Sequence, residues 1–404
     1  MTRFADKYLL DPAVNANPHD YLSALRQYQP VYWSTVHRAW LVTGHSHVVH
    51  CLREPAISAS RVKPIMERIP GSTRGDEERA FGILSGWMVF NDPPVHRRLR
   101  TVFQEQFSAR SINRFRPAIE AAARGLLSKR AVSGNAGDAV ADVAKPLPSL
   151  IFARWLGVPR QHSPAFWYWT ARVSELVLGT TQAEREHRTS IESLLHLYDY
   201  LADLVRLRRA QPGDDLISSV LASGQIGESV TDDEFIGMLT HLAFAGGETT
   251  SNLIANGLRA LLQHPSELDA IRADPDLLPG SIEEVLRFDG PSKMSIRIAA
   301  SDFKLDGATI CAGDRIYLIT AAANRDPALF PDPDRFIATR SNTMHLGFGF
   351  GEHFCIGAPL ARLVARAAIG ALVRDYPNLE LVDVEHTWHL SLLNRSLTML
   401  PIRY

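Results

Sequence analysis

The chain has 404 residues, of which 46% are hydrophobic and 22% charged, so its composition is that of a globular protein with ample material for a large core. Its formal net charge of -1 gives no electrostatic reason to bind nucleic acid or a membrane surface. The three cysteines, Cys51, Cys311 and Cys355, lie far apart and form no Cys-x-x-Cys pair, which argues against a disulfide framework and the usual zinc and iron–sulfur motifs.

The first residues, Met1 to Lys7, mix charged and apolar side chains and lack the apolar region of a signal peptide. No segment approaches the ~18 consecutive apolar residues that a membrane-spanning helix needs. We therefore expect a soluble protein of the reducing cytoplasm. No repeat, low-complexity tract or linker-like break interrupts the sequence, which favours one domain over residues 1–404.

Secondary structure is expected to be mostly helical. Pro30–Trp33 and Ala39–Thr43 are β-branched and aromatic runs that predict a hairpin. The polar stretch from about Arg61 to Asp92 predicts a long loop with one short helix, and loops of that length are usually functional lids or disordered segments. Helical patterns then continue to about residue 290. A second β-rich part follows over 303–320, and alternating apolar residues at 389–400 close the chain, so we predict a mainly α fold with a minor β portion.

The longest predicted helix begins at Thr231 and runs to about His264. Thr231 at the N-cap and Glu234 three residues later form a capping box. Such a helix is ~45 Å long at 1.5 Å per residue, which is enough to cross a whole domain.

The middle of this helix has the sequence Phe244-Ala245-Gly246-Gly247-Glu248-Thr249-Thr250. Each glycine costs about 1 kcal/mol against alanine, and the Thr249 hydroxyl can bond the carbonyl of Ala245. These features predict a kink with a groove that fits water or a diatomic ligand. An acid followed by an alcohol, Glu248 and Thr249, is what a proton relay to bound dioxygen needs. The alternative is a glycine-rich helix crossing with a solvated Glu248.

Cys355 lies in the most distinctive segment, Phe348-Gly349-Phe350-Gly351-Glu352-His353-Phe354-Cys355-Ile356-Gly357. Apolar neighbours exclude water, so its sulfur is either a buried inert thiol or a metal ligand in a dry site. The apolar run from Ala358 predicts a helix with Pro359 in its first turn. The positive end of that helix would stabilise a thiolate.

The pattern Phe-x-x-Gly-x-His-x-Cys-x-Gly resembles, position for position, the haem-binding loop of the cytochromes P450. The resemblance covers essentially the whole chain, and the absence of an N-terminal anchor points to the soluble bacterial type. It implies that the Cys355 thiolate is the axial ligand of the iron of haem b, below a long central helix. Ala245 to Thr249 is similar to the family's Ala-Gly-x-Glu/Asp-Thr motif, which implies that Glu248 and Thr249 deliver protons for dioxygen activation.

The resemblance also implies further haem contacts. The family uses a His-x-x-x-Arg pair for the haem propionates, and His96 and Arg100 match it. Arg297 and His353 match the third and fourth contacts. Ala245, Phe348 and Gly357 are the remaining residues expected to bind the cofactor.

Glu284 and Arg287 match the family's Glu-x-x-Arg pair, which is buried and bonded to a second arginine downstream. By spacing we expect Arg340 as that third member, with Arg335 as the runner-up. The alternative is a surface ion pair worth a few tenths of a kcal/mol. After Arg362 many members carry a glutamate where this chain has Val364, which puts one local surface contact in doubt.

A mostly apolar substrate pocket is expected from Trp87, Met88, Val89, Phe244, Met294 and Leu393, although such residues are more often ordinary core. Two polar residues, His241 and Lys293, accompany them. Lys293 projects toward the pocket or snorkels to solvent, and we favour solvent. One of the two is expected to orient a polar group on an otherwise apolar substrate.

The function expected from these patterns is a haem-thiolate monooxygenase that inserts one oxygen atom of dioxygen into a small, largely apolar molecule. No reductase or flavin domain fits in the remaining length, so a ferredoxin-type donor must supply electrons. Two alternatives stay open, namely oxidative coupling or peroxide-driven oxidation on the same scaffold, and a non-enzymatic haem sensor. We expect a monomer that binds neither nucleic acid nor membrane.

Overall fold

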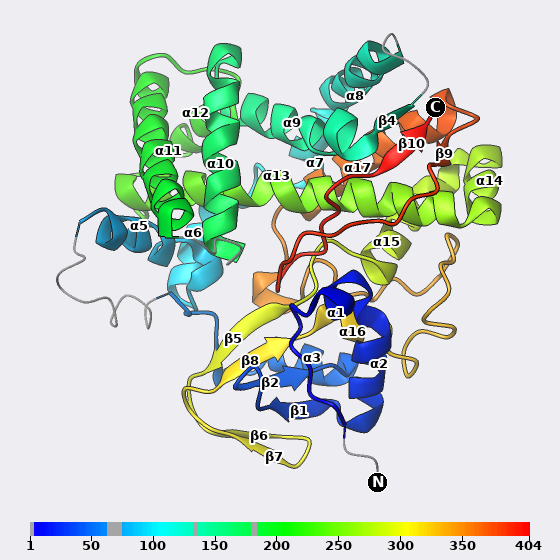
Figure 1. Cartoon of the computed structure of the whole chain (residues 1–404). Helices are drawn as coiled ribbons and strands as arrows, with labels where there is room; N and C mark the ends of the chain where they lie inside the picture. Colours follow the sequence, from blue (N-terminus) through cyan, green and yellow to red (C-terminus); the bar gives the residue numbers. More distant parts are fainter. Residues whose placement is uncertain (1–3, 63–74, 132–135, 179–183) are drawn as a thin grey trace. The chain divides into compact units, whose positions relative to one another are not determined.

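The computed structural model describes residues 4–62, 75–131, 136–178 and 184–404. The chain divides into two compact units. Unit 1 comprises Met1–Ser58, Ala123–Pro146 and Thr249–Tyr404, and unit 2 comprises Ala59–Ala122 and Leu147–Glu248. Every described strand belongs to unit 1, whereas unit 2 is helical (Figure 1). The mainly α fold with a minor β portion is therefore confirmed.

A five-stranded sheet organises the strand-bearing part of unit 1. The strand order is β1–β2–β8–β5–β3, and β2–β8 is the parallel pair. The predicted hairpin is present, with Val31 opposite Val42 across β1 and β2. The five strands are β1 (Val31–Ser34), β2 (Ala39–Val42), β3 (Ile57–Ser58), β5 (Ser295–Ala299) and β8 (Arg315–Leu318).

Two smaller sheets complete the strands of unit 1. β6 (Phe303–Leu305) and β7 (Ala308–Ile310) pair antiparallel, as the second β-rich part of the sequence predicted. β10 (Pro401–Arg403) lies between β4 (Ala136–Asp138) and β9 (Glu380–Leu381). The alternating residues before β10 form no regular strand, and Trp388 and Leu397 pair there as a single antiparallel bridge.

The apolar faces of the five-stranded sheet and of its short helices form one core. Val31, Val42 and Ile316 are at most 1% exposed, and Cys51 packs among them. Burial raises the pKa of the Cys51 thiol to about 12, so it is an inert core residue. The short helices of this part are α1 (Pro12–Ala16), α2 (Pro18–Tyr28), α3 (His45–Cys51) and α16 (Thr320–Ala323), whereas η3 (Val140–Ala144) contacts β4 of the three-stranded sheet.

The remaining helices of unit 1 follow the second half of α13 (Asp232–Gln263) in the chain, and two of them, α15 and α17, pack against it. A Cβ added at Gly257 of α13 would lie 2.9 Å from Ile369 and 3.3 Å from Val285, so three helices approach closely there. Val364, which stands where many family members carry a glutamate, is 2% exposed and lies in the core. These helices are α14 (Pro265–Ala273), η5 (Pro275–Leu277), α15 (Leu278–Phe288), η6 (Gly351–His353) and α17 (Ala358–Asp375).

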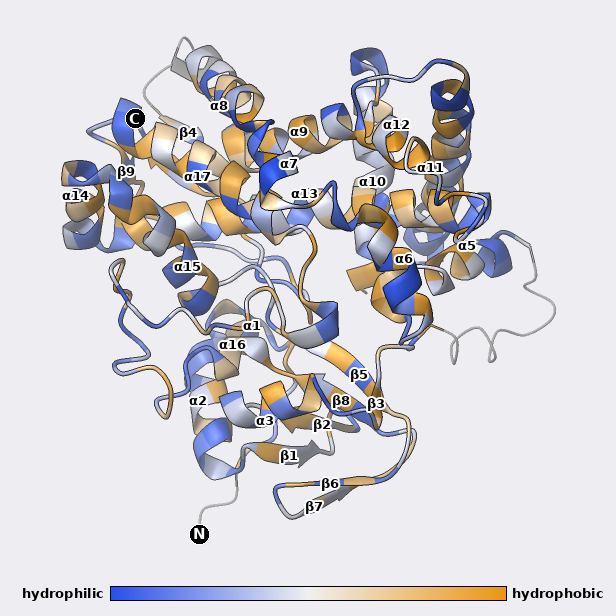
Figure 2. Cartoon of the chain, turned by 180° about the vertical axis from the view of Figure 1, so that it is seen from behind, coloured by the Kyte–Doolittle hydropathy of each residue, from blue (hydrophilic) through white to orange (hydrophobic). Residues whose placement is uncertain are grey.

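Unit 2 contains the first half of α13, which starts with the predicted capping box. The Thr231 backbone N–H donates to Glu234 Oε2 at 3.0 Å, and the Glu234 N–H donates to Thr231 Oγ1 at 3.2 Å. α10 and α11 pack along each other, and α9 is largely apolar (Figures 1 and 2). The other elements are α5 (Asp76–Ser85), η2 (Met88–Phe90), α6 (Val95–Gln104), α7 (Ala109–Asn113), α9 (Pro146–Leu156), η4 (Arg160–His162), α10 (Ser163–Leu178), α11 (Glu184–Ala210) and α12 (Leu216–Leu221).

Three described elements run from one unit into the other, namely α13, α8 (Arg116–Ala131) and, by its first residue Pro146, α9. The helix expected within the loop from Arg61 to Asp92 is α5, and residues 63–74 of that loop lie outside the described residues. None of the helices in the part of the chain that the structure describes is both long and apolar enough to cross a membrane.

Candidate functional site

The predicted site residues are divided between the two units. In unit 1, Cys355 is a half-buried cysteine that forms no disulfide and lies just before α17. Its backbone N–H donates to the Phe348 carbonyl at 2.9 Å, and its own carbonyl accepts from Ala358 N at 3.3 Å. Pro359 lies in the first turn of this 18-residue helix, as predicted. The loop therefore places Cys355 just before the positive end of α17, where a thiolate is stabilised.

Glycine is needed at two positions of this loop. Gly349 and Gly351 have φ angles of +72° and +70°, which other residues rarely adopt. Gly357, which precedes α17, has an ordinary φ of -78°, so the left-handed region is not used there. This turn, its glycine backbone and the Cys355 thiol fit a flat macrocycle with a sulfur ligand to its metal.

Arg297 and His353 are the other predicted haem contacts in unit 1. Arg297 lies on β5, with β8 on one side and β3 on the other. Ser295 to Ile298 are all partly exposed although β5 is an interior strand of its sheet, so its side chains are left incompletely covered. His353 ends η6 and is likewise partly exposed.

In unit 2, α6 carries His96 and Arg100 one turn apart. His96 is 1% exposed and belongs to the apolar face of α6 with Leu99 and Phe103. Arg100 is half-buried, and the opposite face is strongly hydrophilic (Figure 2). The helix thus presents a buried imidazole and a guanidinium along one side, a donor set that suits carboxylate groups.

The middle of α13 is less buried than the turns before it. His241, Leu242 and Ala243 are buried, whereas all residues from Phe244 to Thr249 are partly exposed. The helix is continuous through this stretch, and the predicted kink stays a prediction. A Cβ at Gly246 would clash with the ring of Phe152 on α9. Gly246 is therefore explained by a close helix crossing, which was the alternative interpretation of the glycine pair.

Glu248 lies in acidic surroundings that the sequence did not indicate. Burial raises the pKa of Glu175 on α10, and the charges of Glu186 and Glu248 raise it further, against the influence of Arg172. Arg172 Nη1 lies 2.8 Å from Glu175 Oε2. Glu175 and its partner Arg172 therefore share the electrostatic environment of Glu248. Glu175 lies 73 residues before Glu248 in the sequence, and no motif reveals it.

His241 is part of an aromatic cluster around Trp87. The Trp87 ring is fully buried, stacks on Phe244 with centroids 5.2 Å apart, and lies 5.0 Å from the His241 ring. The indole Nε1–H donates to Thr240 Oγ1 at 2.9 Å. Burial, aided by the charge of His96, lowers the pKa of His241 to about 3, so its imidazole is neutral. Its Nδ1 is buried without a hydrogen-bond partner among the described residues.

The remaining predicted pocket residues also belong to both units. Met88 is buried and Val89 is half-buried in η2 of unit 2. In unit 1, the Lys293 backbone N–H donates to the Leu393 carbonyl at 2.7 Å, so these two segments lie side by side. Met294 beside them is 4% exposed.

The prediction that Lys293 reaches solvent is wrong. Its side chain is 5% exposed, and Nζ donates to Asn15 Oδ1 at 2.9 Å. Burial, together with the charge of Arg395, lowers the pKa of Lys293 to about 7, against the influence of Asp289. The residue is held inside because the N-terminal helix α1 supplies a polar partner for the ammonium group, which the local sequence around Lys293 does not indicate.

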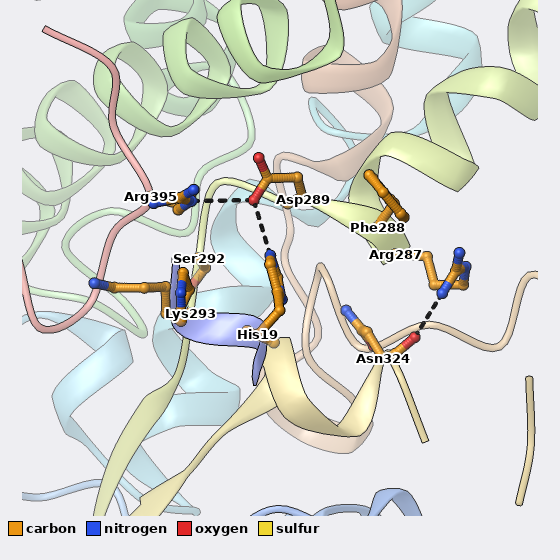
Figure 3. A pocket seen from close by; sticks show the side chains of 11 residues that line it. His19, Arg287, Phe288, Asp289, Ser292, Lys293, Asn324 and Arg395 are labelled. Carbon is orange, nitrogen blue, oxygen red and sulfur yellow. Dashed lines mark hydrogen bonds and ion pairs between the residues drawn. The ribbon is translucent and has the colours of Figure 1, made fainter. Parts of the chain in front are cut away.

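Lys293 lines a small cavity that is built from unit 1 alone (Figure 3). At its edge Asp289 accepts from Arg395 Nε at 3.1 Å and lies 3.5 Å from His19 Nε2. Burial alone would raise the pKa of Asp289, but the charge of Arg395 and the hydrogen bond from His19 hold it well below its usual range. The cavity has room for about one water molecule, so it is too small for an organic substrate.

The structural triad forms as expected, with Arg340 as its third member. Arg287 donates to both Glu284 oxygens at 2.7 Å, and Arg340 Nε lies 3.1 and 3.2 Å from the same two oxygens. The Arg287 and Glu284 side chains are each 1% exposed, so this is a buried cluster rather than a surface ion pair. Arg335 contributes only its backbone carbonyl, which accepts from both guanidinium groups.

Three further residues around the Cys355 loop were not singled out from the sequence as site residues. Glu283, the neighbour of Glu284, binds Arg362 of α17 and His345 upstream of the loop. A signal was available, because Glu283 precedes the Glu-x-x-Arg pair and Arg362 follows the cysteine motif.

Comparisons with known proteins agree with this geometry. Residues 180–400 match the family model described as Cytochrome P450. The chain is 37% identical over 374 residues to Cytochrome P450 monooxygenase PikC of Streptomyces venezuelae, covering 90% of this chain and 85% of that protein. It is 36% identical to Vitamin D(3) 25-hydroxylase of Pseudonocardia autotrophica, covering 96% and 93%. The crystal structure of P450BioI in complex with an acyl carrier protein ligated to hexadec-9Z-enoic acid is similar with a TM-score of 0.89, at 31% identity, covering 98% and 100%.

The chain therefore belongs to the cytochrome P450 family. It is a haem-dependent oxidoreductase of the P450 monooxygenase class, and its cofactor is haem b.

Proposed function

We propose that this enzyme inserts one oxygen atom of dioxygen into a small, largely apolar organic molecule by hydroxylation or epoxidation. The observation that carries the proposal is the position of Cys355 just before the amino end of α17, in a loop with two left-handed glycines. Bound haem supplies the iron that activates dioxygen, and a thiolate ligand donates the electron density that favours O–O cleavage. The relative named Vitamin D(3) 25-hydroxylase supports hydroxylation of an apolar substrate.

The other residues are proposed to hold the cofactor and move protons. His96, Arg100, Arg297 and His353 bind the two propionates, because buried carboxylates need cationic and hydrogen-bonding partners. Ala245, Phe348 and Gly357 line the macrocycle. The Glu248 carboxylate takes protons from solvent, and the Thr249 hydroxyl passes them on.

The cofactor assignment is tested by two cysteine variants. Cys355→Ser removes the proposed ligand, and Cys311→Ser removes an exposed thiol elsewhere in unit 1 as a matched control. We expect the reduced carbon-monoxide complex of the wild type and of C311S to show the thiolate-type Soret band, and that of C355S to lack it. A C355S protein that keeps the band would contradict the assignment.

The reaction type is tested by product analysis with labelled dioxygen. Reconstitution with a ferredoxin and a ferredoxin reductase should yield a product that carries one labelled oxygen atom. A product without label, or turnover with peroxide but not with the ferredoxin pair, would instead support coupling or peroxide-driven chemistry. We further propose that the protein works as a cytoplasmic monomer.

His241 is proposed to orient a polar group of the substrate. Its neutral imidazole has a buried, unpartnered Nδ1 beside the apolar surfaces of Trp87 and Phe244, within the described residues of unit 2. The test compares pairs of apolar ligands that differ by one hydroxyl group, using the spin-state shift of the haem. We expect the wild type to prefer the hydroxylated member and His241→Phe to lose that preference. Equal preference in the two proteins would refute the role.

A further inference from the structure

The Cys355 loop is fastened to α15 by one carboxylate. Arg362 Nε donates to Glu283 Oε1 and Arg362 Nη2 donates to Oε2, both at 2.7 Å. His345 Nε2 lies 3.1 Å from Glu283 Oε2. Because the arginine contact is bidentate, it fixes both distance and orientation.

The protonation of His345 follows from its second contact. Its Nδ1 accepts the Gly347 backbone N–H at 3.1 Å, so the ring hydrogen lies on Nε2 and is donated to Glu283. Gly347 itself must be a glycine, because an added Cβ would lie 2.9 Å from the Leu286 carbonyl of α15. The chain upstream of Cys355 is thereby held directly against α15.

Glu283 therefore holds the loop on both sides of the cysteine. His345 lies ten residues before Cys355, and Arg362 lies seven residues after it. The Arg362 guanidinium also stacks 4.6 Å from the ring centroid of Phe348, whose backbone carbonyl accepts from Cys355 N. The contacts thus run from the carboxylate to the residue that carries the thiol.

The charge on Glu283 is constant over the working pH range. Burial raises its pKa, but the hydrogen bonds from His345 and Arg362 outweigh burial and lower the pKa to about 2. The neighbouring Glu284 serves a different cluster, with Arg287 and Arg340. Removing the charge of Glu283 therefore perturbs the Cys355 loop without touching the triad.

We propose that Glu283 is a positioning residue that clamps both ends of the Cys355 loop and so keeps the thiolate bound to the haem iron. This proposal rests on the role of Cys355 given above. Outer partners of metal ligands fix ligand geometry in the same way, and their loss typically costs 10–100-fold in metal affinity or activity.

The test uses holoenzyme variants with a matched control. Glu283→Gln keeps the shape but replaces one acceptor oxygen by an NH₂ group that opposes the donors, and Glu283→Asp keeps the charge. Arg362→Lys keeps the charge of the partner but loses the bidentate contact and the flat stacking on Phe348. The control is Arg374→Gln, because Arg374 lies near the other end of α17, where it is 64% exposed and pairs with Asp375.

The measured quantities are the decay of the thiolate-type Soret band in the reduced carbon-monoxide complex, the haem reduction potential and the thermal unfolding midpoint. We expect the band to decay about tenfold faster in E283Q and in R362K. We also expect a shifted potential in both variants, partial recovery in E283D and wild-type behaviour in R374Q.

Two outcomes overturn the proposal. In the first, E283Q and R362K keep the wild-type band lifetime and potential. In the second, only their unfolding midpoint falls, which would make the cluster a purely structural support. If E283Q does not fold, the band lifetimes and reduction potentials of R362K and E283D test the proposal instead. A wild type without any thiolate-type band would instead refute the role of Cys355, so failure of the proposed function is distinguishable from failure of this inference.

Discussion

Asp289→Asn is expected to cause a large loss of stability, because it removes the carboxylate around which a buried group of cations is arranged. Asp289 is 5% exposed and lies 3.1 Å from Arg395 and 3.5 Å from Arg259. Lys293 is buried nearby with an amide oxygen as its partner. Asparagine has nearly the same shape, so the substitution changes the charge and leaves the packing almost intact.

The expected loss in free energy of unfolding follows from the burial of the Asp289–Arg395 pair. Breaking a buried ion pair by removing one partner costs about 3–5 kcal/mol, because the other charge stays inside without compensation. Asparagine still offers an acceptor oxygen to Arg395 and His19, so we expect the lower end, about 3 kcal/mol. The folded-state pKa of Asp289 is depressed, so this stability is present above the unfolded pKa of ~3.9 and is lost only as the pH falls below it.

The assay is urea unfolding of the holoenzyme at pH 7, followed by far-ultraviolet circular dichroism. The matched control is Asp334→Asn, because Asp334 also pairs with an arginine, Arg325, at 3.0 Å but is 69% exposed. Exposed pairs are worth less than about 1 kcal/mol, so D334N should behave almost like the wild type. If the two variants lose the same free energy of unfolding within about 1 kcal/mol, the reasoning from burial is wrong.

Three further outcomes are expected. Because the pKa of His241 is depressed in the folded state, the protein should lose stability as the pH falls from about 6.5 to about 3, by up to about 1.4 kcal/mol per pH unit. In urea unfolding, H241F should flatten this dependence of the free energy of unfolding on pH. An unchanged dependence would contradict the neutral, buried state of His241. Gly246→Ala should destabilise the protein by about 1–3 kcal/mol because its Cβ meets Phe152. Gly247→Ala, whose Cβ would lie 3.7 Å from Ser149, should be neutral or stabilising by up to about 1 kcal/mol. If G247A unfolds at a lower temperature than G246A, the close helix crossing at Gly246 is contradicted. Thr249→Val should lower product formed per electron pair consumed by at least about tenfold, while Thr250→Val should not; equal coupling in both would remove Thr249 from the proton path.

Local signals in the sequence were enough for much of the fold. The capping box at Thr231 placed the start of α13, and two β-branched and aromatic runs separated by polar residues placed the β1–β2 hairpin, because both signals depend on residues close together in the chain. The Cys355 loop and the Glu284–Arg287 pair are also short motifs. Arg340 could be predicted as the third member of the triad from its spacing to the Glu284–Arg287 pair.

The features that the sequence did not indicate all depend on distant partners. Lys293 is buried because Asn15 lies beside it, although 278 residues separate them. Glu283 binds Arg362 across 79 residues. The residues next to a lysine or glutamate in the sequence do not show whether the fold brings a hydrogen-bond partner from a distant segment. Without such a partner, the charged side chain is more stable in solvent than in the interior. For the same reason Gly246 suggested a kink, whereas its contact with Phe152 is a property of the folded packing.

The parallel pairing of β2 with β8 has a consequence for synthesis of the chain. Trp40 lies opposite Ile316, so one strand of the pair leaves the ribosome 276 residues before the other. At typical rates of about 5–20 residues per second, the β1–β2 hairpin waits about 14–55 s with a free strand edge. Open edges of that kind recruit other strands. The sheet of unit 1 therefore closes only late in translation, and the nascent hairpin is where chaperone assistance or low expression temperature should most improve the yield of native enzyme.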